Sequence, residues 1–200
     1  MWTYLKFFLP VYLLAFFAAG FAWRSYRVWK QTGINPYALG QSDTAHDFIG
    51  QLFRLTLLAC ASVVLLYAFF EAGYRYLTPI GWLEQPQLIT LGVGLLIAAL
   101  VWTIMAQAQM GNAWRIGIDS AHATELVEAG VFRLSRNPVF LGMRMMLLGF
   151  SLILPNVATL TILVLGDVLM QIQVRLEEEH LMRLHGDHYR VYCRRVRRWL

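Results

Sequence analysis

Long apolar stretches separated by short polar segments dominate the chain. Five of them are long enough, or nearly so, to cross about 30 Å of hydrocarbon as a helix. They run from Leu5 to Ala22, Phe48 to Phe70, Leu88 to Gln107, Val139 to Leu154 and Val157 to Val174. The pattern therefore predicts an all-α integral membrane protein with about five transmembrane helices.

Turn-forming residues divide the last two stretches. Only Pro155 and Asn156 separate them, a helix breaker beside a turn former, which predicts a tight antiparallel hairpin in the C-terminal half. The third stretch ends in Gln107, Gln109 and Asn112, which we expect at a boundary with water. The Gly-Val-Gly sequence at residues 92–94 predicts close helix packing, because a nucleotide-binding loop would need a preceding strand.

Composition supports a membrane protein. Hydrophobic residues make up 58% of the chain and charged residues only 14%, and the mean hydropathy is +0.51. These values exclude an ordinary soluble domain. No internal repeat or low-complexity segment divides the sequence, so we expect a single membrane domain over residues 1–200.

Basic residues predict the orientation of the bundle. Arg24, Arg27 and Lys30 follow the first stretch, and seven arginines follow the fifth, whereas the hairpin tip has none. The positive-inside rule then puts the N-terminus outside and the C-terminus in the cytoplasm, as in a bacterial or archaeal inner membrane protein. The first stretch is expected to be an anchor, since a signal peptide carries its basic residues before the apolar core.

The basic tail after the fifth stretch alternates arginines with aromatic and aliphatic residues at helical spacing. Such an amphipathic helix typically rests on anionic lipid headgroups, so we expect a membrane surface there and no nucleic acid. No disulfide is expected between Cys60 and Cys193, which lie in different regions. No metal site is expected either, because the histidines lack the spacing of a tetrahedral zinc site.

Residues Ser135 to Gly142 form the first of two polar signals. Pro138 disfavours helix at Asn137, so a helix is predicted to begin just after Asn137. The free backbone N–H groups at that helix start suit an anionic group. Gly142 leaves space for a flat ligand or for a neighbouring helix. The alternative is a membrane-entry turn in which Gly142 only packs.

Three adjacent glutamates, Glu177 to Glu179, form the second signal. One interpretation is a solvated helix start, since carboxylates favour the first turn of a helix. The other is that at least one glutamate points inward and binds a cationic or hydroxyl-bearing partner. The predicted hairpin brings this cluster to the same end of the bundle as Arg136, which indicates one site built from both signals.

The order of these motifs resembles the membrane methyltransferases that include isoprenylcysteine carboxyl methyltransferase and the phospholipid methyltransferases. The core of that family has a Gly-aromatic turn, R-H-P-x-Y-x-G, a two-helix hairpin, E-E-x-x-L and F-G-x-x-Y-x-x-Y. The matching residues here are Gly130 and Phe132, Arg136 to Gly142, Glu177 to Leu181 and His185 to Tyr192. The resemblance covers the chain from about Gly111 onward and implies a catalytic core at residues 111–200, after the first three stretches in residues 1–110.

The resemblance implies that S-adenosylmethionine binds where the fourth and fifth stretches end and that its methyl group passes to a lipophilic carboxylate, thiol or amine. The cofactor-binding residues it implies are Gly130, Phe132, Asn137, Pro138, Leu141, Gly142, Glu177, Glu178 and Tyr189. Arg136 and Arg175 are the candidates for orienting an acceptor carboxylate, because arginine pairs bidentately with carboxylates.

Two positions depart from the family pattern. Asn137 stands where the family has histidine, so its role is expected to be hydrogen bonding and not proton transfer. Phe140 lacks the hydroxyl of the usual tyrosine, which leaves packing as its expected role. Trp114, Arg115 and Asp119 are candidates for the border of the site.

Two other classes of protein remain open alternatives. One is a membrane reductase of the sterol-reductase type, which has a similar R-x-P-x-x-x-G turn and uses NADPH. The other is a membrane scaffold without catalytic activity. The sequence does not indicate the oligomeric state.

Charged residues inside the predicted spans suggest specific contacts. Arg144 lies eleven residues before Pro155 and Asp167 eleven after Asn156, so an antiparallel hairpin places them at one depth. Each would cost about 2.5–3.5 kcal/mol if unpaired at mid-bilayer. We therefore predict an ion pair, with a polar substrate tunnel as the alternative. Arg54, near the cytoplasmic end of the second stretch, is expected to snorkel towards the headgroups.

Overall fold

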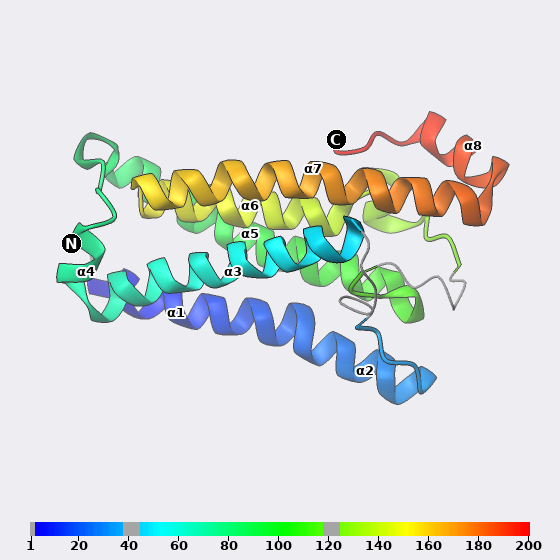
Figure 1. Ribbon diagram of the computed structural model, residues 1–200, viewed down its shortest axis with the longest axis horizontal. Helices are drawn as coiled ribbons and strands as arrows, with labels where there is room; N and C mark the ends of the chain where they lie inside the picture. Colours follow the sequence, from blue (N-terminus) through cyan, green and yellow to red (C-terminus); the bar gives the residue numbers. More distant parts are fainter. Residues whose placement is uncertain (1–2, 38–44, 118–124) are drawn as a thin grey trace.

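The computed structural model describes residues 3–37, 45–117 and 125–200. Its long helices run side by side along one axis (Figure 1). Among the described residues, four helical segments are long and apolar enough to cross a membrane: Thr3–Thr32, Ala45–Phe69, Pro86–Ala113 and Val157–His185. The predicted all-α integral membrane fold is therefore confirmed.

The N-terminal segment is one continuous rod built from α1 (Thr3–Phe17), a π-helical turn η1 (Ala18–Ala22) and α2 (Trp23–Thr32). The helix therefore runs ten residues past the predicted end at Ala22. It stops at Gly33, whose φ of 70° is the left-handed conformation that ends many helices. Basic residues of α2 do not break the helix, since arginine and lysine are good helix formers.

Helix α3 (Ala45–Phe69) returns along α1 and is followed by a short α4 (Glu71–Arg75) and a 3₁₀ turn η2 (Gly81–Leu83). Helix α5 (Pro86–Met110) then begins at a proline, which suits the first helical position, and continues into η3 (Gly111–Ala113). Another 3₁₀ turn, η4 (Gly130–Arg133), precedes the hairpin.

The predicted hairpin consists of α6 (Pro138–Ile153) and α7 (Val157–His185). Asn156 caps α7: its side chain accepts a hydrogen bond from the Thr159 N–H, while the Thr159 hydroxyl accepts one from the Asn156 N–H. Helix α6 has 16 residues, about 24 Å at the usual rise. The fourth predicted span is therefore a shorter apolar helix than the other four.

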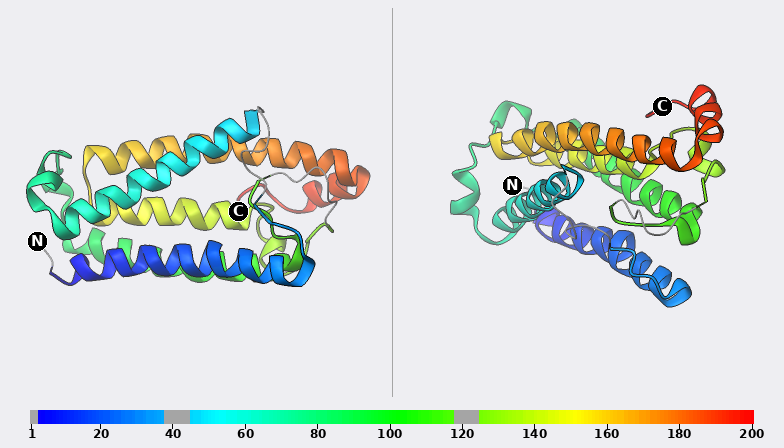
Figure 2. Two further views of the ribbon diagram at one scale, coloured as in Figure 1. Left: turned by 60° about the horizontal axis from the view of Figure 1, so that its bottom comes forward. Right: turned by 45° about the vertical axis from the view of Figure 1, so that its right-hand side comes forward.

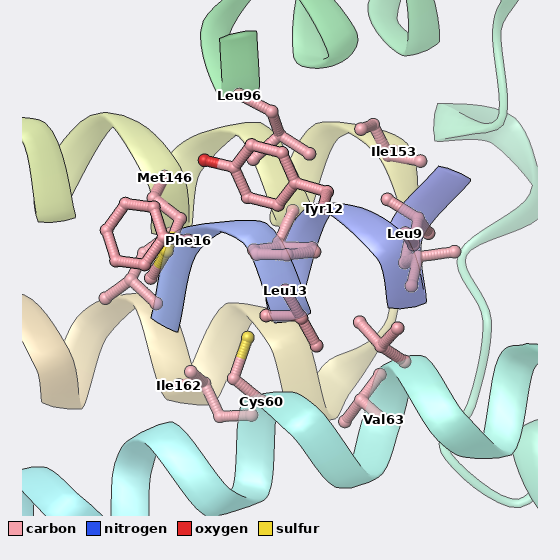
Figure 3. Close-up of a cluster of buried hydrophobic side chains, with 14 of the residues drawn as sticks. Leu9, Tyr12, Leu13, Phe16, Cys60, Val63, Leu96, Met146, Ile153 and Ile162 are labelled. Atoms are coloured by element: carbon pink, nitrogen blue, oxygen red, sulfur yellow. The ribbon is translucent and has the colours of Figure 1, made fainter. Parts of the chain in front are cut away.

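The core of the bundle forms around α1. Leu9, Tyr12 and Phe16 are buried, with residues of α3 and α7 on one side of α1 and residues of α5 and α6 on the other (Figure 3). Tyr12 packs edge-on against Phe150 of α6, with ring centroids 5.7 Å apart. Large apolar side chains such as Phe7 point out of the bundle instead, as expected for helices surrounded by hydrocarbon.

Helices α5 and α6 approach closely through glycines. A β-carbon added at Gly92 would lie 2.8 Å from the backbone oxygen of Gly149, and one added at Gly149 would lie 3.0 Å from that of Gly92. Gly94 has open space around it. The packing role predicted for the Gly-Val-Gly sequence is therefore confirmed for Gly92, and Gly94 takes no part in it.

The predicted ion pair in the hairpin is also confirmed. A guanidinium nitrogen of Arg144 lies 2.6 Å from a carboxylate oxygen of Asp167. The guanidinium also stacks over the ring of Trp199, 4.3 Å from its centroid. Neither charged residue lines the cavity described below, so the pair is a contact within the helical hairpin.

Gln107 differs from its predicted position. We expected it at a boundary with water, but α5 continues to Met110 and Gln107 is only 1% exposed. Its amide packs against Gly20 in the π-helical turn of the first rod, where a β-carbon would lie 3.7 Å from the Gln107 nitrogen, and neither amide atom has a hydrogen-bond partner in the described part of the chain. Gln109, two residues later, is exposed as expected.

The tail begins with α8 (Asp187–Arg195), which turns back at the end of α7 so that the chain end lies over the bundle (Figures 1 and 2). The apolar side of α8 faces the protein: Tyr189 and Tyr192 are buried, whereas Val191 is exposed. The expectation that this apolar face rests on lipid therefore needs correction for the two tyrosines, because neighbouring protein segments cover them.

Candidate functional site

The turn before α6 is held by the tail. The Arg136 N–H donates to the carbonyl of Arg197 over 3.0 Å, and the Ser135 hydroxyl donates to the carbonyl of Arg198 over 3.2 Å. One guanidinium nitrogen of Arg136 donates to the carbonyls of Cys193 and Val196. The tail backbone thus supplies the acceptors that fix this turn.

Glu178 lies at the centre of the contact between the turn and α7. Its carboxylate accepts hydrogen bonds from the Arg136 guanidinium at 3.1 and 3.2 Å and from Arg198 at 2.8 and 3.1 Å. The Asn137 amide nitrogen donates to the same carboxylate over 3.0 Å. Three side chains therefore donate hydrogen bonds to the Glu178 carboxylate. The hydrogen bond from Arg198 raises the pKa of Arg198.

A cavity of about 630 Å³ opens beside this network. Its volume lies within the range of about 300–1,000 Å³ that is typical of small-molecule sites. Apolar side chains of the first rod, α3 and α6 form much of the wall. Polar side chains come from α7 and the turn before α6, and also from the first rod, α3, α8 and the segment after η3. Representative lining residues are Phe17, Phe21, Phe53, Leu57, Phe140, Met143, Trp114, Gln173, Glu177 and Tyr192.

The structure brings six of the predicted site residues to the cavity wall, and with them Trp114 and Arg115 from the predicted border. The six are Phe132, Arg136, Asn137, Pro138, Glu177 and Tyr189. Asp119, the third border candidate, lies outside the described residues.

The other predicted site residues lie away from the cavity wall. Glu178 is behind it, in the ion-pair network. Gly130, at φ 61°, packs against Gln109, and Gly142 packs against Thr103 of α5. Leu141 is one turn into α6 without lining the cavity. Arg175 is exposed on α7 and donates to the carbonyl and side chain of Gln171.

Gln173 is a wall residue that the sequence did not single out. Its amide nitrogen lies 3.0 Å from a carboxylate oxygen of Glu177 and 3.0 Å from a ring nitrogen of His46 on α3. The signal was present in the sequence, since Gln173 and Glu177 are four residues apart and share one face of a helix. The contact with His46 depended on how α3 packs on α7.

Some buried polar atoms of the cavity wall have no hydrogen-bond partner in the described part of the chain. They are the Ser25 hydroxyl, the Trp114 ring nitrogen and the Gln173 carbonyl oxygen. Buried polar groups normally find a partner, so such atoms indicate a bound molecule or water. Together they offer a donor, an acceptor and a hydroxyl that can do both.

The two buried tyrosines of α8 close one side of the cavity. The Tyr192 hydroxyl donates to the carbonyl of Phe132 over 2.6 Å, which ties α8 to the 3₁₀ turn η4. Burial raises the pKa of Tyr192 to about 12, and it raises the pKa of Tyr189 further. Both phenols are therefore neutral at physiological pH and serve as hydrogen-bonding and packing groups.

Glu128 joins the segment before η4 to α8 on this side of the cavity. Leu126 packs against the α8 tyrosines, and the nearby Glu128 lies 2.5 Å from a side-chain nitrogen of both His188 and Arg195. In the described residues no group of three or more His, Cys, Asp or Glu side chains is arranged to hold a metal ion. Cys60 and Cys193 are free thiols.

The fold is that of an integral membrane protein with a cavity of small-molecule size at the α8 end of its bundle. The profile of the phospholipid methyltransferase family matches residues 88–188, half of the chain. That segment contains α5, α6 and α7 with the turn before α6. The chain therefore belongs to the phospholipid methyltransferase family. A search of curated proteins finds no match.

Proposed function

We propose that the cavity binds S-adenosylmethionine and that the protein transfers its methyl group to a lipophilic acceptor in the bilayer. The observation that carries this proposal is the composition of one cavity wall: Glu177, Gln173 and Trp114 present polar atoms, while α3 and the first rod present apolar side chains. A charged cofactor and an apolar acceptor can both be accommodated there.

The residues of the wall fit the groups of this cofactor. Glu177 has one oxygen bonded by Gln173 and a second for an ammonium or ribose hydroxyl, and the Gln173 oxygen is a further acceptor. Backbone N–H groups in the first turn of α6 suit a carboxylate. The aromatic faces of Trp114 and Phe132 suit a sulfonium, whose methyl group is activated for displacement when the cofactor is bound.

Arg136 and Asn137 act in this proposal by positioning other groups. The guanidinium of Arg136 is held by Glu178 and two carbonyls of the tail, so it fixes the wall on which the acceptor lies. Asn137 donates to Glu178, in keeping with hydrogen bonding instead of proton transfer. Arg175 is directed away from the cavity and has no part in the proposal.

Catalysis then rests on orientation and on the exclusion of water. The leaving group is already cationic, so no dedicated nucleophile of the protein is required, and holding the acceptor in line supplies much of the rate. The buried aromatic wall of Tyr189, Tyr192 and Trp114 keeps water from the reacting atoms. Carboxylate, thiol and amine acceptors are all compatible with this arrangement.

Calorimetric titration of detergent-purified protein with S-adenosylmethionine and with NADPH tests the proposal. We expect only S-adenosylmethionine to bind. The Glu177→Gln variant should bind it about tenfold more weakly, because a charge-assisted contact is lost. The matched control is Glu179→Gln, whose exposed carboxylate pairs with Arg183 and whose affinity should equal that of the native protein.

The alternatives give different results in the same titration. Binding of NADPH alone would support a reductase, and binding of neither molecule would support a scaffold. Either result would overturn the proposal. Labelled methyl transfer to membrane lipid extracts then identifies the acceptor.

A further inference from the structure

An arginine lies within a membrane-spanning helix and on the cavity wall. Arg54 is in α3, nine residues after its first residue, and its neighbours Phe53 and Leu57 line the same wall. A charged side chain in such a helix is costly and generally marks a site of function. The position of Arg54 beside apolar wall residues therefore needs a reason.

The guanidinium of Arg54 differs from those of the other two arginines on the wall. Arg136 donates to Glu178 and the tail, and Arg115 donates to the carbonyls of Asn112 and Trp114. Arg54 instead lies over the ring of Tyr37, 5.0 Å from its centroid. In the described part of the chain no hydrogen bond or ion pair engages Arg54, and the residue is exposed, so its N–H donors can reach a ligand.

The wall also separates opposite charges by helix. On the cavity wall, α7 contributes the acidic residue Glu177, and α3 contributes the basic residue Arg54. An anionic group is repelled by the first and attracted by the second. The side chains of Phe53, Leu57 and Phe17 lie on the cavity wall contributed by α3 and the first rod and can cover an alkyl chain.

We propose that Arg54, supported by Tyr37, is the receptor for an oxyanion carried by the lipophilic acceptor, so that the substrate is an anionic amphiphile. This assignment rests on the proposed function of the cavity. A carboxylate and a phosphate share the recognised chemistry, since a guanidinium pairs with either in a bidentate manner. The aromatic face of Tyr37, which also lines the cavity, limits the positions of the guanidinium.

Binding of single-chain amphiphiles in neutral detergent tests the assignment. The probes are labelled dodecyl phosphate, dodecanoate and dodecanol, which differ in the headgroup alone. The native protein should bind an anionic probe at least about tenfold more tightly than the alcohol. The anion that binds more tightly tells a phosphate headgroup from a carboxylate.

Two variants of Arg54 and one control variant distinguish specific binding of the anion by Arg54 from a general effect of positive charge. Arg54→Gln should lose the preference for the anion, and Arg54→Lys should keep part of it, because a lysine retains the charge without the bidentate geometry. The control is Arg133→Gln, an exposed arginine in η4 outside the cavity wall, which should behave as the native protein.

The outcomes distinguish this proposal from the function on which it rests. An anion preference that survives in Arg54→Gln, or that is missing from the native protein, would overturn the role of Arg54. S-adenosylmethionine affinity, measured in the same samples, should be unchanged in Arg54→Gln, which also shows that the variant is folded. If the native protein binds the anion through Arg54 but does not bind S-adenosylmethionine, the methyl-transfer proposal fails and the anion site stands.

Discussion

Glu178 illustrates how a residue predicted to bind a ligand can hold the protein together instead. Its carboxylate accepts from Arg136, Arg198 and Asn137, while its neighbour Glu177 reaches the cavity. Consecutive helical residues point about 100° apart, and here that difference turns Glu177 to the cavity and Glu178 to the turn before α6. The sequence indicated an acidic site but not which of the two glutamates would face it.

The charge balance around Glu178 predicts a large effect of its removal. In Glu178→Gln, two guanidinium groups remain close together without a carboxylate, and the free energy of unfolding should fall by about 3 kcal/mol. Denaturant unfolding in micelles measures this change. The tail should also become accessible to trypsin, because Arg198 loses its partner.

Glu179→Gln is the matched control for this experiment. Its ion pair with Arg183 is exposed, so its removal should cost no more than about 0.5 kcal/mol. Equal stability of the two variants, or a tail that stays protected in Glu178→Gln, would contradict the central role of this carboxylate.

At the scale of elements, the close helix packing of α5 was predicted correctly from the sequence. The Gly-Val-Gly sequence indicated close packing, and Gly92 indeed meets the backbone of α6 at Gly149. The hairpin was predictable because Pro155 and Asn156 carry strong local turn chemistry. The equal spacing of Arg144 and Asp167 from that turn then fixed their pairing.

A pair of leucine substitutions tests the packing of these helices. Gly92→Leu should force α5 and α6 apart and lower the free energy of unfolding by about 1–3 kcal/mol, the usual cost of overpacking. Gly94→Leu should leave it nearly unchanged, since nothing lies within 4 Å of an added β-carbon at Gly94. The free energies of unfolding of both variants are measured in the same detergent. Equal values would contradict the close packing of α5 and α6 at Gly92.

At the scale of the whole molecule, the apolar pattern predicted the bundle because every spanning helix must satisfy its own backbone. The return of the tail to the bundle was not predictable. The backbone carbonyls of Cys193, Val196 and Arg197 accept hydrogen bonds from Arg136. Because every residue type has the same backbone carbonyl, these contacts leave no signal in the sequence. The burial of Gln107 was missed because it depends on Gly20, far away in the sequence.

The distribution of basic residues predicts the orientation of the whole bundle in the membrane. We propose that the α8 end, with Arg24, Arg133 and the arginines of the tail, lies in the cytoplasm, and that the hairpin tip lies outside. Single cysteines introduced at Trp82, which is exposed in η2, and at Arg194 of α8, after Cys60 and Cys193 are replaced by serine, test this in intact cells. A membrane-impermeant thiol reagent should label the first alone; labelling of the second alone would reverse the orientation.

The docking of the tail against the turn before α6 has a consequence for biosynthesis. The tail carbonyls that accept from Arg136 follow it by 57 to 61 positions, so the ribosome completes both helices of the hairpin, including Glu178, before these carbonyls exist. Until the tail is made, the Arg136 guanidinium at the start of α6 lacks its tail acceptors. The cavity is therefore a late product of folding, finished only after the membrane-spanning helices are already inserted.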